Sequence, residues 1–468
     1  MKRIFLTGVA MAALSASMAF AGEPKVEKEV SPPPAWLDTL TIDGWLSGGV
    51  VVNPSQPFNK INFGHLFTDR ANTPQFNQGI LTVARPLDPK AEGFDFGFKM
   101  QWMLGTDARY SHYLGVLDYA IHDRTQIAPI EAHVLAHLPI LTQGGIDVKI
   151  GQFVTLNGAE VIPAKDNLFY SHSYIFNFGP FVHTGVMTNT HVTPWLDFYA
   201  GISSGVNTSL GWPGDNNRSP SFHGGFGLNL LDGNLTVLAI THAGPENPKQ
   251  LDPYGVGWPN TPVVCACSPS STWRYFNNLT TTWKATENLT FITDISYMRE
   301  DGNITISRTG LPDNTLDELG ALYGFTPADL GRRPQGADAY GVAQYISYKV
   351  DDVLKLNGRI EYWRDNKNFF AAAFPGYFDA VNTGHGFYSP STIFQPANVG
   401  TSYLALTAGM TITPEVPEMP IIKGIIFRPE VRWDVAVNGA TPFFGPGARN
   451  KRSTGLIAMD VIVPFSIR

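Results

Sequence analysis

The sequence predicts an all-β fold, a transmembrane antiparallel β-barrel of about 16 strands with long extracellular loops and short periplasmic turns. Segments of about ten residues alternate apolar and polar side chains, which suits a tilted strand that crosses a bilayer. The connections between these segments alternate between long and short along the chain. Glycine is abundant at 46 residues and aromatic residues make up 12%, which favours β-structure with many turns.

The N-terminal residues have the pattern of a signal peptide, expected over 1–21. Lys2 and Arg3 precede a short apolar run, and the small-x-small rule places cleavage after Ala21. A buried N-terminal helix is the alternative reading of this segment. Residues 22–40 are rich in proline and are expected to form a periplasmic lead-in.

Composition and charge restrict the class of partner. Charged residues make up 16% of the chain and the net charge is −7, so no basic footprint for nucleic acid is present. The two cysteines, Cys265 and Cys267, are too few for a disulfide framework. A metal or redox site is one interpretation, but no histidine-rich motif lies beside them, which favours a loop-tip disulfide or two idle thiols.

The barrel itself is expected over residues 41–468. Alternation predicts strands near 41–52, 75–85, 93–104, 129–138, 146–153, 182–191, 195–204, 222–231, 234–243, 274–284, 288–299, 338–349, 354–365, 401–412, 424–436 and 453–467. Short connections are expected at the periplasmic end and long ones outside. An even number of strands returns the C-terminus to the periplasmic side.

The stretch 424–437 shows which face meets lipid. One set of alternating side chains is apolar, and the other set, which includes Arg428 and Asp434, is charged. Because unpaired charges are costly in hydrocarbon, the apolar face should meet lipid and the ionic face water inside the barrel. Pro429 lies within this strand, so a bulge or a weak point in pairing is expected there. So many strands enclose an aqueous channel unless a loop blocks it.

Residues 154–181 are predicted to fold inward as a constriction loop, because they lose the alternation and are rich in Phe and Tyr. The charged or titratable residues expected to line the pore come from this loop and from the polar faces of the strands. They are Glu160, Lys165, Asp166 and His172 from the loop, and Lys99, Lys149, Arg359, Glu361, Arg428, Glu430, Arg432 and Asp434 from the wall. The alternative is that the wall charges in 428–434 only form stabilising ion pairs, and that the aromatic residues only pack the loop.

The same region carries a family resemblance. The motif residues are Gly151, Phe153, Gly158, Glu160, Asn167, Tyr170, Ser171, Tyr174, Phe181, His183, Thr184 and Gly185. This segment resembles the OmpL-like β-barrel porins of Gram-negative bacteria, and the resemblance extends from Gly44 through the final strand. It implies an outer-membrane pore of about this length with a signal peptide, but no cargo. The cysteine pair and the non-aromatic C-terminus depart from that pattern, and Phe465 is expected to replace the terminal aromatic residue.

The function expected is a porin that lets ions and small hydrophilic solutes diffuse passively. The alternatives are a non-conducting sleeve or receptor for a partner protein, an outer-membrane barrel enzyme, or a secreted all-β sugar-binding protein. No phosphate loop, dinucleotide fingerprint or zinc-protease motif is present, so no catalytic residue, cofactor or metal is predicted. His133 and His137 would lie about 13 Å apart along a strand, too far to share a metal. Membrane lipid and small hydrophilic solutes are the expected partners, and the sequence leaves open whether the protein forms a homo-oligomer.

Overall fold

The structure, a computed structural model, describes most of the chain from residue 39 onward. The described ranges are 39–88, 91–211, 214–215, 217–246, 263–265, 270, 273–301, 304–306, 337–368, 370–371, 381, 400–417 and 419–467. The predicted signal peptide, residues 22–38 of the predicted lead-in, Cys267 and the side chain of Cys265 lie outside the described residues.

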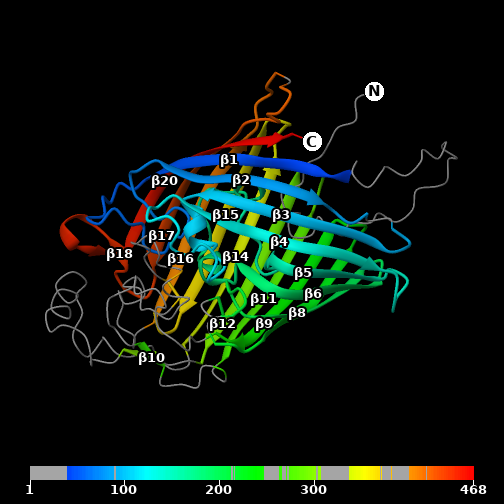
Figure 1. Cartoon of the computed structure of the whole chain (residues 1–468). Helices are drawn as coiled ribbons and strands as arrows, with labels where there is room; N and C mark the ends of the chain where they lie inside the picture. The colour runs from blue at the N-terminus through cyan, green and yellow to red at the C-terminus, as the bar shows by residue number, and fades with distance from the viewer. Residues whose placement is uncertain are drawn as a thin grey trace.

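Sixteen antiparallel strands close into a barrel, and each strand pairs with its neighbours in chain order (Figure 1). The first strand pairs with the last to complete the ring. The barrel strands are β1(Thr41–Val52), β2(Gln75–Arg85), β3(Asp95–Gly105), β4(Gln126–Leu138), β5(Ile146–Val154), β6(Val182–Thr193), β7(Leu196–Ser203), β8(Ser221–Leu230), β9(Leu235–Pro245), β11(Trp273–Lys284), β12(Leu289–Glu300), β14(Ala337–Lys349), β15(Leu354–Asp365), β16(Thr401–Ile412), β17(Ile426–Ala436) and β20(Ser453–Ser466). The predicted fold class and strand number are confirmed.

The remaining elements lie in the connections. Two small sheets pair β10(Val263–Cys265) with β13(Ile304–Ile306) and β18(Phe443–Phe444) with β19(Asn450–Lys451). The helical elements are short: η2(Asp107–Tyr110), η3(Ala164–Asp166), α1(Tyr174–Phe178) and η5(Pro446–Ala448). No helix among the described residues is both long and apolar enough to cross a membrane.

Tight turns join the strands at one end of the barrel. Between β8 and β9 the chain reverses within residues 231–234, where Leu231, Asp232 and Gly233 all have positive φ. Such left-handed backbone matches the twist of a hairpin. The turn fixes the register, so Leu230 pairs with Leu235 and each earlier residue of β8 pairs with a later one of β9.

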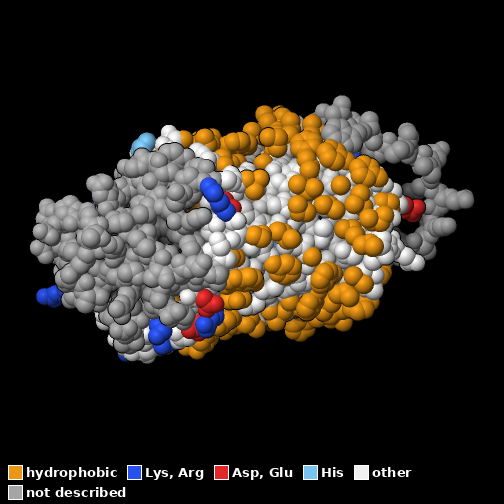
Figure 2. Space-filling view, turned by 60° about the horizontal axis from the view of Figure 1, so that its bottom comes forward, with side chains coloured by type: hydrophobic (Ala, Val, Ile, Leu, Met, Phe, Trp, Pro, Cys, Tyr) orange, Lys and Arg blue, Asp and Glu red, His pale blue; other side chains and the backbone are white. Residues whose placement is uncertain are grey.

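The outer surface of the barrel is apolar. Figure 2 shows hydrophobic side chains over the barrel body and charged side chains of the described residues toward its ends. On β17, Val431 and Trp433 are 54% and 44% exposed, whereas Arg432 and Asp434 between and beside them are 3% and 0% exposed. The strand therefore turns its apolar side outward and its charged side inward, as a lipid-facing barrel requires.

Pro429 interrupts one ladder without shifting the register. Its pairing with Met459 on β20 belongs to a continuous ladder. On the other side, β16 pairs with β17 up to Gly409 opposite Glu430 and again at Ile412 opposite Phe427, but the described ladder omits the two pairs between them. Because proline has no N–H to donate, the expected weak point takes the form of missing pairs.

Three long connections fold into the barrel and pack on one another. They are residues 53–74, residues 106–125 and residues 155–181, and the last is called the inward loop from here on. Phe67 of the first connection contacts Phe176 and Phe181 of the inward loop, with ring centroids 5.2 and 6.3 Å apart. The aromatic residues of the loop thus belong to apolar clusters inside the barrel that also include residues of the wall and of the other connections.

Candidate functional site

The inward loop crosses the interior of the barrel and is attached to several strands. At one side, the backbone N–H of Gly158 donates to Asn278 of β11 (2.9 Å) and that of Ala159 donates to Asp294 of β12 (2.8 Å). Further along, the backbone N–H of Ala164 donates to Gln78 of β2 (3.0 Å). These bonds satisfy loop backbone that would otherwise be buried without partners.

Glu430 of β17 holds the middle of the loop. Its two carboxylate oxygens accept the backbone N–H groups of Tyr170 (2.9 Å) and Ser171 (3.1 Å). Four residues along the strand, Asp434 accepts the hydroxyl of Tyr174 at 3.0 Å. The charged face of β17 is therefore covered by the loop, whereas the sequence placed water there.

Three buried arginines join the loop to the wall. Arg359 of β15 pairs with Glu160 of the loop (2.6 Å) and with Glu361 of its own strand (3.3 Å), and it donates to the carbonyl of Ser171 (2.8 Å). Arg432 pairs with Glu361 (2.8 Å) and donates to the carbonyl of His172 (3.0 Å). One network thus links two strands and the loop.

The third arginine, Arg428, connects the loop to the last strand. Its Nη1 donates to the carbonyls of Ala164 (2.8 Å) and Asn167 (2.7 Å), and its Nε donates to Asp460 of β20 (2.9 Å). Buried charges are tolerated only when they are paired and fully hydrogen-bonded. This seam, defined as Glu160, Arg359, Glu361, Arg428, Glu430, Arg432, Asp434 and Asp460, largely meets that condition through bonds between loop and wall. Nε of Arg359 and one oxygen of Glu361 face each other at 3.3 Å as an ion pair without a hydrogen bond.

His172 lies against the seam as a neutral side chain. Its ring stacks on Phe176 with centroids 4.1 Å apart. Burial lowers the pKa of His172 well below its usual value, and the positive charges of the three seam arginines lower it further. Acidification would therefore add a charge where burial and three cations oppose it.

The stretch of wall from β3 to β5, together with part of the inward loop, carries charges that keep contact with solvent. Lys99 of β3 is 33% exposed and pairs with Glu131 of β4, while Lys149 of β5 is half-buried. Lys165 of the loop is 36% exposed and pairs with Asp166 at 2.8 Å. The structure thus divides the twelve residues singled out in the sequence. Four retain exposure, namely Lys99, Lys149, Lys165 and Asp166, and the other eight, including His172, are buried.

Several residues that hold the loop were missed in the sequence. Two of them, Asn278 and Gln78, accept hydrogen bonds from the loop backbone, and Asp460 accepts one from Arg428, which itself bonds to the loop. Asp460 could have been found, because the apolar alternation of the final strand leaves it on the inward face. Asn278 and Gln78 carry no such signal, since only the crossing of the loop brings them near it.

The chain belongs to a family of porin-like outer-membrane barrels. The family model described as "Putative beta-barrel porin-2, OmpL-like" matches residues 39–465, which is nearly the whole described chain. This confirms the resemblance seen in the sequence. The comparison with curated proteins finds no match.

Solved structures of similar fold include outer-membrane proteins. The outer-membrane channel DcaP of Acinetobacter baumannii is 10% identical, with a TM-score of 0.47 over 91% of this chain and 96% of that one. OmpT of Vibrio cholerae, an outer-membrane protein in trimer form, is 10% identical with a TM-score of 0.45 over 91% and 99%. OprB of Pseudomonas putida is 12% identical with a TM-score of 0.44 over 92% and 95%.

Proposed function

We propose that the protein is an outer-membrane porin through which ions and small hydrophilic solutes diffuse. The observation that carries this is the partly exposed charge left inside a closed sixteen-stranded barrel, on β3, on β5 and on the inward loop. A barrel of this size has more interior than its own side chains fill. The inward loop crosses the interior, and the passage would run beside it along β3 to β5.

The charges on that side suit a filter of mixed sign. Lys99 and Lys165 lie within Coulombic range of Asp43 on β1, and Asp166 adds a second carboxylate. Lys149 stands over the ring of Phe153, 5.8 Å from its centroid. Opposed charges at a narrow point orient polar solutes and select among ions. Lys99, Lys149, Lys165 and Asp166 would act in this way, and the eight buried residues would hold the loop that narrows the passage.

The proposal includes export and orientation. Residues 1–21 would act as a signal peptide cleaved after Ala21, and residues 22–40 would remain in the periplasm. The tight turns would face the periplasm and the long connections the outside. Assembly into a homo-oligomer is compatible with this arrangement and remains a prediction.

The test is electrical. Purified full-length protein inserted into a planar bilayer should give stepwise conductance increases that grow with salt concentration. A barrel that inserts, as shown by flotation with vesicles, but conducts no current would contradict the proposal and favour a sleeve or receptor. A protein that remains in buffer without detergent would contradict membrane insertion itself.

A further inference from the structure

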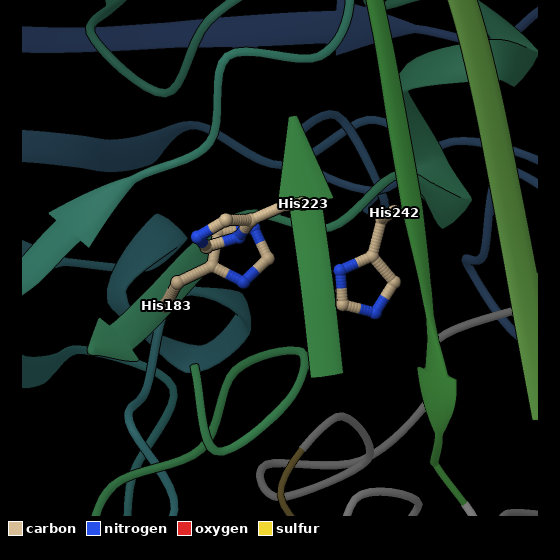
Figure 3. Close-up of side chains that lie close together, drawn as sticks. All are labelled: His183, His223 and His242. Carbon is tan, nitrogen blue, oxygen red and sulfur yellow. The ribbon is translucent and has the colours of Figure 1, made fainter. Parts of the chain in front are cut away.

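Three histidines meet on the inner wall of the barrel, at the end that carries the long connections. They are His183 of β6, His223 of β8 and His242 of β9, and each is at most 1% exposed. Figure 3 shows the three rings gathered at one place from separate strands. Their candidate ligand atoms all lie within 4.8 Å of one another. None of them takes part in the seam or in the proposed passage.

Strand pairing explains how they meet. His223 and His242 are direct partners in the β8–β9 ladder. His183 lies on the other side of β7, whose inward-facing position opposite His223 is Gly201. A Cβ at Gly201 would lie 2.3 Å from Nε2 of His223, so only glycine leaves the ring its place. The rings of His183 and His223 then approach to 4.6 Å between centroids across β7.

The hydrogen bonds of the rings leave nitrogen lone pairs available. Nδ1 of His183 donates to the carbonyl of Gly205 (3.2 Å), and Nε2 of His242 donates to Glu246 (2.8 Å). Because a carbonyl and a carboxylate only accept, the opposite nitrogens, Nε2 of His183 and Nδ1 of His242, are left as acceptors. Those atoms, and both ring nitrogens of His223, have no hydrogen-bond partner among the described residues. Buried polar atoms without partners cost about 1–3 kcal/mol each, so such a cluster calls for a ligand.

Glu246 has the place of an orienting group behind the cluster. It accepts from His242, from the hydroxyl of Ser221 (2.8 Å) and from the backbone N–H of Val206 (3.0 Å). Metal-bound histidines usually donate their other N–H to a carboxylate or a backbone carbonyl, which fixes the tautomer and raises ligand basicity. Both arrangements are present here, one on His242 and one on His183.

We propose that His183, His223 and His242 bind one divalent transition-metal ion of the Zn²⁺ class. Imidazole nitrogen suits Zn²⁺, Cu²⁺, Ni²⁺ and Co²⁺, whereas Ca²⁺ and Mg²⁺ require oxygen ligands. Bonds of about 2.0–2.1 Å bring tetrahedral ligand atoms to roughly 3.3 Å apart, so the rings would close inward on binding. Phe153 packs on two of the rings and limits access of water from the wall. The bound ion would tie β6, β8 and β9 together near the mouth.

The experiment measures metal binding by the full-length protein in detergent. After treatment with a chelator and its removal, the protein is titrated with Co²⁺, whose visible absorption reports coordination, and Co²⁺ is then displaced by Zn²⁺. We expect one Co²⁺ per chain with the spectrum of a four-coordinate site, in which one water completes the three imidazoles, and three imidazoles in X-ray absorption of the Zn²⁺ form. Stoichiometry near zero, or a spectrum of hexaaquo Co²⁺, would overturn the proposal.

Variants identify the residues. His223→Gln should abolish the four-coordinate spectrum, and Glu246→Gln should weaken binding about 10–100-fold while all three ligands remain. The matched control is His112→Gln, because His112 is also buried but its Nε2 lies 2.8 Å from Gln126. Folding of each variant is checked by circular dichroism and heat-modifiable migration. Equal binding by the wild type and both site variants would contradict the assignment, and Glu246→Gln keeps the test available if His223→Gln does not fold.

Discussion

Two walls of the same barrel treat their inward charges differently. On β15 and β17, Arg359, Arg428 and Arg432 are buried under the inward loop and bonded to it. On β3 and β5, Lys99 and Lys149 lie on the same inner surface but keep part of their exposure. Strand alternation places all five on the inner face.

The difference teaches that a charged side chain can face the inside of the barrel without lining the pore. Alternation is a local pattern, and it decides which face of the sheet a side chain takes. Whether that side chain then meets water depends on where a loop of 27 residues, 155–181, comes to lie. The seam serves attachment of the loop, and the solvated wall is the one that could act on solutes.

The largest expected effect on stability comes from removing an arginine of the seam. Arg359→Met leaves Glu160 and Glu361 buried without their shared cation, so the free energy of unfolding should fall by about 3–5 kcal/mol. The matched change at a pair whose two partners keep contact with solvent, Lys165→Met beside Asp166, should cost less than about 1 kcal/mol. Urea unfolding in detergent micelles, followed by tryptophan fluorescence, measures both. Similar losses in the two variants would remove the distinction between buried and solvated inward charges.

The next effect is a dependence of stability on pH. Because burial and the seam arginines lower the pKa of His172 in the folded protein, the unfolded chain binds the extra proton below about pH 6.5. Stability should therefore fall with acidification, by at most about 1.4 kcal/mol per pH unit from this residue. His172→Gln should show a shallower fall than the wild type between about pH 5 and 6.5, with parallel curves above about pH 7. Identical slopes throughout would contradict a neutral His172.

A smaller, local effect is expected at Glu430. Glutamine has one acceptor oxygen where the carboxylate has two, so Glu430→Gln should lose one of the bonds to Tyr170 and Ser171. Local opening of the loop should become easier by about 1–3 kcal/mol. Amide hydrogen exchange at these two residues measures it, with Glu131→Gln on the solvated wall as the control. Unchanged protection in Glu430→Gln would show that the loop is held by other bonds.

The sequence predicted the sheet better than it predicted the site. Strand positions follow from local alternation, and even the interruption at Pro429 could be foreseen from the missing N–H. An inward loop was predicted from its aromatic residues, but its attachment to Glu430 and Arg359 depends on contacts between residues about 190 to 260 positions apart. No local pattern carries that information, so buried and exposed inward charges could not be told apart.

The histidine cluster illustrates the same limit with one exception. The positions of His223 on β8 and His242 on β9 follow from the tight turn at 231–234, because that turn sets the two histidines opposite each other. Knowing the hairpin register would have paired these two histidines from the sequence alone. His183 could not have been added in this way, since it reaches them across Gly201 of another strand.

The smallest effect is expected at the interrupted ladder. Pro429→Val restores an N–H on the side of β17 that faces β16, and should change stability by no more than about 1 kcal/mol in the favourable direction. Urea unfolding compared with the wild type measures it. A large loss would show that proline at this position supports the seam beside it.

The most direct measurement of the central claim is the reversal potential of the channel under a salt gradient. Lys149→Glu and Lys165→Glu alter the solvated wall and the exposed part of the loop, whereas Glu430→Gln alters a buried charge. The account predicts that each lysine variant shifts the reversal potential toward cation preference and that Glu430→Gln leaves it unchanged. A shift in Glu430→Gln with none in the lysine variants would place the passage along the seam and contradict the account.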